Sequence, residues 1–325
     1  MNLDPQAIEL IQTHSHFVLT SHVDPDGDGL GGILGLALAL KSLGKTVSCS
    51  LSGGFQEKYR FLPGSDMLVQ GLPEAFPKGK KTVLVSIDAA HLDRLGFDSS
   101  EIEALNPTVL NIDHHTSNKM FGDVNYFDSL AAASCEVIWH LIKELGVTKD
   151  SEMATALYCG LLTDTGRFRF SNTTERAMRY GAEMLGAGAR HTQVVRKLFE
   201  ENPWNKLHLE SLVLPTLKRE GKMAWLTVRK EMMQAAETDD TEDFVNKITE
   251  IKGMEIAILF KEVEPELTKI SLRAVNNIDV NQIASVYGGG GHSKAAGAKL
   301  KMSLEAAIES VTSACRETLH KMELL

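Results

Sequence analysis

Short β-branched apolar runs that stop at an acidic residue or a histidine are the feature that most constrains how this chain can fold. The runs of this form are FVLTSH (17–22), TVLVSID (82–88) and TVLNID (108–113), and TVSCSL (46–51) matches them in length. Such runs are typical of buried parallel strands. Helical patterns alternate with them at 30–44, 134–146, 151–162 and 174–188. Residues 1–190 therefore predict a doubly wound α/β domain with a mostly parallel sheet.

Six side chains of the kinds that bind metals lie at the ends of these segments. They are His22, Asp26, Asp28, Asp88, His114 and Asp164. In an open α/β sheet, ligands bind outside the carboxyl ends of the strands, so we expect these side chains to converge on one sheet edge. Carboxylates that lie close together disfavour one another's ionisation, and divalent cations relieve this. Asp164 follows a helical run, so a C-terminal turn would explain that residue on its own.

The segment 24–29 also resembles the start of a calcium-binding loop, because it fits the pattern D-x-D-x-D-G. Such a loop needs a glutamate at its twelfth position. That position is Gly35 here, and an apolar strand rather than a helix precedes the segment. We interpret the segment as a strand-end turn that directs carboxylates into a shared site, with a solvated acidic turn as the alternative.

Two adjacent histidines follow the run TVLNID. One imidazole of such a pair can bind metal while the other faces a substrate, and Asp113 can fix the tautomer of a neighbouring ring. Arg167 and Arg169 come just after Asp164 and could contact phosphate. The alternation in RFRF equally fits a half-exposed strand.

A second, smaller α/β domain is predicted over 213–325, after a helical linker over 191–212 that is interrupted at Asn202-Pro203. Strand-like runs lie at 223–228, 254–263 and 268–275, and helical patterns at 241–253, 280–288 and 303–322. The strands on either side of Glu264-Pro265 predict a hairpin, so we expect antiparallel strands in this domain.

Four consecutive glycines, Gly288–Gly291, precede His292 in this second domain. Glycines let a backbone approach a ligand closely and present its N–H groups to an anion. A flexible linker is the other interpretation, but helix-like apolar segments on both sides place the glycines inside the domain. Arg273, at the end of TKISLR, could reach the same place, and Lys294 is a weaker candidate.

The composition limits the classes of partner. The formal net charge of −9 argues against binding long duplex nucleic acid, which needs a basic surface, but it allows a small phosphorylated substrate. The longest apolar stretch, 30–40, is too short to span a bilayer, and no signal peptide is evident at the start. Four widely spaced cysteines match neither a zinc site nor a disulfide framework. We therefore expect a cytoplasmic protein with reduced thiols and no membrane partner.

These motifs together resemble those of the DHH phosphoesterase family. His22, Asp26 and Asp28 resemble its first motif, and Asp88 its second. Asp113-His114-His115 resembles the third motif, which names the family, and Asp164 the fourth. The segment Gly289-Gly290-Gly291-His292 resembles the signature of the DHH-associated C-terminal domain. The length and domain pair are most similar to the oligoribonuclease branch, whose members also dephosphorylate 3′-phosphoadenosine 5′-phosphate (pAp).

The resemblance implies a site with two Mn²⁺ ions, for which Mg²⁺ or Co²⁺ could substitute. His22, Asp26 and Asp88 would hold one ion, and Asp28, Asp88, His114 and Asp164 the other. The mixture of imidazole and carboxylate favours Mn²⁺ over Mg²⁺ on chemical grounds too. His115, oriented by Asp113, would act in catalysis. Arg273, Gly289, Gly290, Gly291 and His292 would bind the substrate.

The expected activity is hydrolysis of short RNA to 5′-mononucleotides, with pAp as a second substrate, by two-metal activation of water. A cyclic or linear dinucleotide phosphodiesterase, a RecJ-type exonuclease and a family II pyrophosphatase share this chemistry and are alternatives. A non-catalytic nucleotide sensor is an alternative from a different class. Short RNA and small nucleotides are the expected partners, and a homodimer is left open.

Overall fold

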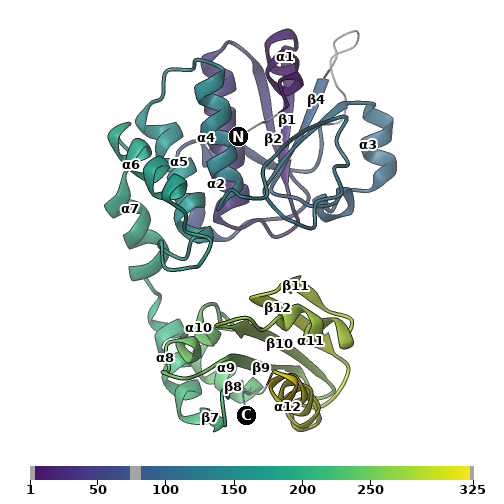
Figure 1. Cartoon of the computed structure of the whole chain (residues 1–325), viewed down its shortest axis with the longest axis vertical. Coiled ribbons are helices and arrows are strands. Elements are labelled where there is room, and N and C mark those ends of the chain that lie inside the picture. Colours follow the sequence, from purple (N-terminus) through teal and green to yellow (C-terminus); the bar gives the residue numbers. More distant parts are fainter. Residues whose placement is uncertain (1–3, 74–81, 323–325) are drawn as a thin grey trace. The chain divides into compact units, whose positions relative to one another are not determined.

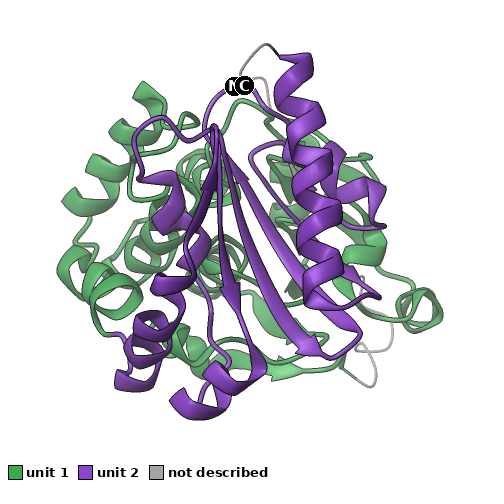
Figure 2. Ribbon diagram, turned by 90° about the horizontal axis from the view of Figure 1, so that it is seen from below, with its two compact units in different colours: residues 1–201 green, residues 202–325 purple. Residues whose placement is uncertain are grey.

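The computed structural model describes residues 4–73 and 82–322, which belong to two compact units (Figure 1). The units are Met1–Glu201 and Asn202–Leu325, drawn in separate colours in Figure 2. This division differs from the predicted separate linker over 191–212. Helix α7 (His191–Val195) and a π-helical turn, Arg196–Glu200, belong to the first unit, whereas α8 (Trp204–Val213) begins the second. Pro203 lacks the N–H that a continuous helix would need, which explains why the chain divides here.

The first unit is built on a six-stranded sheet in the order β3-β2-β1-β4-β5-β6, in which every pairing is parallel. The four strands predicted from apolar runs are all present. The other two, β3 and β6, are short and lie at the two edges, so their sequences carry little signal. The strands are β1 His16–Ser21, β2 Thr46–Leu51, β3 Leu68–Gln70, β4 Thr82–Ile87, β5 Thr108–Asp113 and β6 Val124–Phe127.

Helices cover both faces of this sheet, as a doubly wound fold requires. One face packs on α2, α4 and α5 in a large core, and the other packs on α3 and the 3₁₀ turn Leu92–Leu95 in a smaller one. The helices are α1 Gln6–Thr13, α2 Gly27–Ser42, α3 Ser99–Leu105, α4 Ser134–Glu144, α5 Ser151–Asp164 and α6 Glu175–Gly186. Two further 3₁₀ turns cover Glu57–Tyr59 and Ser65–Met67.

The second unit has its own six-stranded sheet, in the order β11-β12-β10-β9-β8-β7. The predicted hairpin is confirmed, because Glu264 of β9 pairs with Leu267 of β10. The expectation of antiparallel strands is wrong for β8 and β9, which are parallel because a crossover with two helices joins them. The strands are β7 Lys218–Glu220, β8 Met223–Val228, β9 Ile256–Glu264, β10 Leu267–Ala274, β11 Gly290–His292 and β12 Ala295–Leu300.

Helices α11 and α12 pack on one face of the second sheet, and α8, α9 and α10 cover part of the other. Their bounds are α9 Lys230–Ala236, α10 Phe244–Thr249, α11 Val280–Val286 and α12 Leu304–Lys321, and a 3₁₀ turn covers Leu214–Thr216. Among the described residues of the chain, no helix has the length and apolar character needed to cross a membrane. All four cysteines are free and buried.

Candidate active site

The first predicted ligands lie where β1 leads into α2. Asp26 is the N-cap of this helix, and its Oδ1 accepts hydrogen bonds from the N–H groups of Asp28 (2.9 Å) and Gly29 (3.2 Å). His22 comes directly after β1, and Asp28 is fully buried in the first helical turn. The segment is therefore a strand-to-helix turn, as predicted, rather than a calcium-binding loop.

Glycines let α2 and α5 approach each other closely enough to bring Asp28 near Asp164. A Cβ atom on Gly31 would lie 2.4 Å from the carbonyl oxygen of Ala156 in α5. A Cβ atom on Gly160 would lie 2.8 Å from Oδ1 of Asp28. Because real Cβ atoms do not tolerate such contacts, Gly31 of α2 and Gly160 of α5 serve this packing. Asp164 is the last residue of α5, so a helix rather than a strand positions this residue at the site.

The structure brings all six predicted ligands together in two groups. The ligand atoms of His22, Asp26 and Asp88 lie within 4.8 Å of one another, and so do those of Asp28, His114 and Asp164. Asp88 lies between the groups, with Oδ2 3.6 Å from His22 Nε2 and Oδ1 3.6 Å from His114 Nε2. Its φ of 60° is unusual for a residue other than glycine, as is common at functional sites.

The hydrogen bonds of the two histidines fit a metal site. Nδ1 of His22 lies 2.8 Å from the carbonyl oxygen of Val23, and Nδ1 of His114 lies 3.2 Å from that of Ala131. A carbonyl can only accept, so Nδ1 carries a proton in both rings, and in the neutral form of each ring Nε2 offers its lone pair to the site. Among the described residues, Nε2 of His114 is buried without a hydrogen-bond partner. A divalent cation at this position would satisfy it.

Charges within the cluster change its protonation. Burial favours the neutral form of Asp88, but the hydrogen bond from His22 and the charges of His115 and His114 outweigh it and hold the pKa of Asp88 below its usual range. Burial, with Asp88 and Asp164 close by, raises the pKa of Asp28 well above its ordinary value. Burial opposes the charged form of His22, yet Asp88 and Asp26 raise its pKa to about 9. Without metal, the cluster therefore holds protons at neutral pH.

The N-terminus of α4 contributes contacts that the sequence analysis missed. The backbone N–H groups of Ser134 and Cys135 donate to Asp28 Oδ2 (2.6 Å) and Oδ1 (2.9 Å), and Ser134 Oγ donates to Asp88 Oδ1 (3.1 Å). Helix N-termini stabilise anions in this way. The only sequence signal was a serine at the start of a helical pattern, which is common in any helix.

A buried ion pair holds the loop before α4. Arg176 of α6 binds both Asp128 and the buried Glu136, and Glu136 Oε2 also accepts from the N–H of Ala132 (2.7 Å). This loop carries Ala131, whose carbonyl fixes the ring of His114. These residues act on the metal ligands indirectly and could not be recognised from their spacing in the sequence.

Asp113 orients His115 as predicted for the second histidine. Asp113 Oδ1 accepts from His115 Nδ1 at 2.7 Å, and Asn118 donates to Asp113 Oδ2. His115 also lies 3.5 Å from Asp88 Oδ1 and so could join a third group with Asp88 and His114. The shorter hydrogen bond to Asp113 distinguishes His115 from His114, whose Nε2 faces the metal-binding side chains. Burial lowers the pKa of His115, but Asp113 and Asp88 raise it more, so that its net shift is upward.

Comparison with known proteins decides the family. The chain matches the family model for the N-terminal domain of the DHH family over residues 16–161, and that for the DHHA1 domain over residues 222–321. A protein from Thermus thermophilus, named bifunctional oligoribonuclease and PAP phosphatase NrnA, is 36% identical over 93% of this chain and 89% of its own length. The chain belongs to the DHH family.

Other relatives support this DHH assignment. The protein of the same name from Bacillus subtilis is 25% identical over 91% of this chain and 92% of its own length. A crystal structure of an exopolyphosphatase-related protein from Bacteroides fragilis has a TM-score of 0.90 and 25% identity, and covers 99% of this chain and 98% of that chain. RecJ of Thermus thermophilus shares only the fold, with a TM-score of 0.52 and 16% identity over 96% of this chain and 54% of that chain. The prediction of a DHH phosphoesterase, a hydrolase, is confirmed.

The two arginines after Asp164 lie in a turn of the DHH unit, so the possible half-exposed strand is not formed. Arg167 and Phe168 have φ values of 63° and 60°, which no strand adopts. The guanidinium of Arg167 lies 4.8 Å from the ring centroid of Phe199, and Arg169 Nε donates to Gly166 O at 3.1 Å. A phosphate contact from either arginine stays a prediction.

The predicted substrate-binding residues of the DHHA1 unit lie along the β11, β12 and β10 edge of its sheet. Arg273 of β10 pairs in register with Ala295 of β12, which also pairs with the backbone of His292 in β11. The side chain of His292 lies outside the described part of the structure. Arg273 forms no ion pair among the described residues, although burial lowers its pKa. Lys294 Nζ donates to the carbonyl of Ile278.

The glycines of this DHHA1 segment differ in what they do. A Cβ atom on Gly289 would lie 2.2 Å from the carbonyl oxygen of Gly297, and one on Gly291 would lie 2.4 Å from that of Ala295. These two glycines are therefore needed for packing against β12. A Cβ atom on Gly290 would meet nothing closer than 3.9 Å. Of the three glycines predicted to bind the substrate, only Gly290 has the open side that close approach of a ligand requires, so the prediction for Gly289 and Gly291 lacks this support.

Proposed function

We propose that this DHH phosphoesterase hydrolyses short oligoribonucleotides to 5′-mononucleotides and also removes the 3′-phosphate of pAp. The observation that carries the proposal is the position of Asp88 between two groups of metal-binding side chains. The relatives named bifunctional oligoribonuclease and PAP phosphatase align over nearly the whole chain and suggest the substrate class.

In this proposal two Mn²⁺ ions occupy the site, and Mg²⁺ or Co²⁺ can replace them. One set of ligands is His22, Asp26 and Asp88, and the other is Asp28, Asp88, His114 and Asp164. Such a pair of ions supplies an activated water and stabilises the charge that develops on the phosphoryl oxygens. The N-terminus of α4 keeps Asp28 directed at the site, and the Ala131 carbonyl keeps Nε2 of His114 directed there.

His115 is the proposed proton donor. Asp113 accepts from its Nδ1, which orients the ring, and the upward shift of the His115 pKa makes the ring easier to protonate. His115 then contacts the scissile phosphate and gives a proton to the leaving oxygen. Asp113 acts through His115 as a positioning residue.

The DHHA1 unit is proposed to bind the nucleotide and its phosphate through Arg273, Gly289, Gly290, Gly291 and His292. Arg273 supports this, because its half-buried guanidinium forms no ion pair among the described residues, although the charge of Asp243 acts on it, and such a group is suited to an anionic ligand. With a net charge of −9, the protein is expected to reject long duplexes. In this proposal the substrates are products of RNA decay, and we therefore propose that the protein acts in the cytoplasm.

A substrate panel tests the proposal. Protein purified with Mn²⁺ is offered a labelled RNA dinucleotide, pAp, cyclic di-AMP and pyrophosphate, each with and without EDTA. We expect mononucleotide release from the dinucleotide and AMP from pAp, both lost in EDTA and restored by Mn²⁺. Failure to cleave the dinucleotide at high enzyme concentration contradicts the proposal, and so does faster cleavage of cyclic di-AMP or pyrophosphate. Nucleotide binding without any hydrolysis would identify a sensor.

A further inference from the structure

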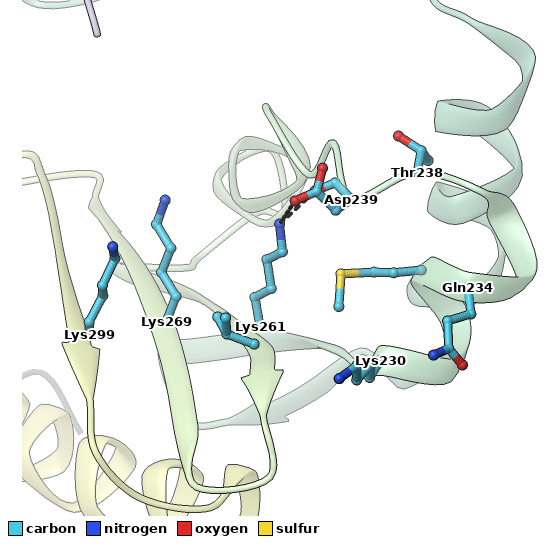
Figure 3. Close-up of a pocket in the computed structure, with 9 residues that line it drawn as sticks. Lys230, Gln234, Thr238, Asp239, Lys261, Lys269 and Lys299 are labelled. Atoms are coloured by element: carbon cyan, nitrogen blue, oxygen red, sulfur yellow. Dashed lines mark hydrogen bonds and ion pairs between the residues drawn. The ribbon is translucent and has the colours of Figure 1, made fainter. Parts of the chain in front are cut away.

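Three lysines of the second unit form a row across neighbouring strands. Lys299 of β12 pairs in register with Lys269 of β10, which pairs with Lys261 of β9. Residues directly opposite each other in a sheet share a face, and Figure 3 shows the three side chains projecting to the same side. With Lys230 and Asp239 they line an open cavity of about 590 Å³. We call Lys261, Lys269 and Lys299 the lysine row.

Ion pairing within the protein does not explain the lysine row. Lys261 Nζ lies 3.2 Å from Asp239 Oδ2 and donates to the Asp239 carbonyl at 2.6 Å. Among the described lysines that line the cavity, only Lys261 forms an ion pair, so Lys230, Lys269 and Lys299 are left without one. Like charges directly opposite in a sheet destabilise it. In a chain with a net charge of −9, this concentration of positive charge indicates an anionic ligand.

The lysine row shares its sheet face with Arg273. Lys269, Ser271 and Arg273 alternate along β10 and so point to one side. Between the lysine row and Arg273, Ser271 pairs with Gly297, which pairs with Gly290. This stretch of the face therefore carries only small residues on these three strands. At about 3.4 Å per residue, Lys269 and Arg273 are about 14 Å apart along the strand.

We propose that the lysine row and Lys230 bind the internal phosphodiester groups of an oligoribonucleotide whose terminal nucleotide is held near Arg273. A linear series of cations beside a floor of small residues fits a repeating chain of phosphates better than a single phosphate. The open cavity also suits a strand that passes over the sheet rather than an enclosed small molecule. This subsite proposal extends the function proposed above and rests on that function for the identity of the ligand.

The expected consequence is a dependence on substrate length. When pAp is held at Arg273, it is too short to reach the lysine row. A pentanucleotide held at the same place reaches it. Removing lysines of the row should therefore weaken the longer ligand selectively. Because each lost phosphate contact reduces the number of released counterions, the salt dependence of pentamer binding should fall as well.

The test compares two double variants of the full chain. In Lys269→Ala/Lys299→Ala the row is broken, and in the control Lys218→Ala/Lys252→Ala two exposed lysines of the same unit are removed, so that both lose the same charge. Binding of labelled RNA pentamer, dinucleotide and pAp is measured by fluorescence anisotropy at several salt concentrations, in an Asp88→Asn background that prevents hydrolysis. Circular dichroism checks that each variant is folded.

We expect the row variant to raise the pentamer Kd by about tenfold and to reduce the slope of log K against log salt by about 1.4, for two lost contacts with a single strand. The Kd values for dinucleotide and pAp should stay within about twofold, and the control should bind all three ligands normally. Lys269→Arg/Lys299→Arg should restore pentamer binding, since it keeps the charge.

An unchanged pentamer Kd overturns the inference, and so does an equal loss with the control variant or an equal loss for pAp. Hydrolysis of the dinucleotide by the unmodified protein is measured alongside. If the dinucleotide is not cleaved but pentamer binding still depends on the row, the proposed function fails while the anion subsite stands. If cleavage occurs and the row variant binds normally, only the subsite is wrong.

Discussion

Asp88 is the residue on which the site depends most, because both groups of ligands meet at its carboxylate. We expect Asp88→Asn to lower dinucleotide hydrolysis by at least about a hundredfold and to reduce bound Mn²⁺, with the fold retained. Turnover and elemental analysis of the same preparation check this. Near-normal activity would show that Asp88 is not shared between two ions.

Proton binding by the metal-free cluster predicts how metal affinity depends on pH. The pKa of His22 is raised to about 9, so metal-free protein holds a proton there at neutral pH, and Asp28 also binds one more readily than a free carboxyl. Mn²⁺ must displace these protons, so its affinity should rise with pH through the range below about 9. Calorimetry in buffers of different ionisation enthalpy should show proton release, and a binding heat independent of buffer would contradict this.

The raised pKa of His22 also makes the stability of the metal-free protein depend on pH, in a direction that can be stated. A histidine whose pKa is raised from 6.5 to about 9 stabilises the folded state fully below pH 6.5. That contribution is lost as the pH rises through about 9. Metal binding, which needs the neutral ring, therefore has the opposite pH dependence.

Two neighbouring glycines of the DHHA1 signature should respond differently to the same substitution. Gly290→Ala adds a methyl group where nothing lies within 3.9 Å, so the fold should persist while the KM for pAp rises. Gly289→Ala would place Cβ 2.2 Å from a backbone oxygen and should destabilise the protein by about 1–3 kcal/mol. Urea denaturation and steady-state kinetics distinguish them. An unchanged KM for Gly290→Ala would mean that this glycine does not face the substrate.

At the scale of elements, the contact between α2 and α5 determines whether the ligands meet. Gly31→Ala would force these helices apart, because its Cβ would lie 2.4 Å from the Ala156 carbonyl. We expect a loss of about 1–3 kcal/mol of unfolding free energy and weaker Mn²⁺ binding, since Asp28 and Asp164 lie on the separated helices.

Gly186→Ala is the matched control for this substitution. Gly186 ends α6, and a Cβ atom there would have no neighbour within 4 Å. Since alanine is the better helix former, stability should stay the same or rise by up to about 1 kcal/mol. Equal stability losses in the two variants would argue against close packing as the reason for Gly31.

At the scale of the whole molecule, two separate sets of cores predict two unfolding transitions. The cluster around α2 and α5 belongs to the first unit, and those around the second sheet belong to the other. A ligand stabilises only the structure that binds it. Mn²⁺ should therefore raise the melting temperature of the first unit alone.

Tryptophan fluorescence can assign the transitions. Trp139 is buried in the first unit, whereas Trp204 and Trp225 belong to the second. In a Trp204→Phe/Trp225→Phe variant, the transition seen by fluorescence should shift with Mn²⁺ and return to its original temperature in EDTA. A calorimetric scan in which both transitions shift together would contradict independent units.

Much of the first unit could be predicted because its signal is local. Residues 82–87 and 108–113 are rich in apolar, β-branched side chains, as is typical of strands buried on both faces, and each leads into a polar ligand. The edge strands β3 and β6 are too short for such a pattern. In the second unit, the parallel pairing of β8 and β9 depends on a crossover of 27 residues (229–255) that the strand sequences do not encode.

The amino-acid sequence by itself determined which side chains could serve as ligands and that all of them but Asp164 follow strands of one parallel sheet, because residue type and apolar periodicity are properties of short segments. Only the tertiary structure decided that α2 lies against α5, that the N-terminus of α4 faces Asp28 and that three lysines align across β9, β10 and β12. These contacts join residues far apart in the chain, and their geometry follows from close packing and strand register, which no local pattern specifies.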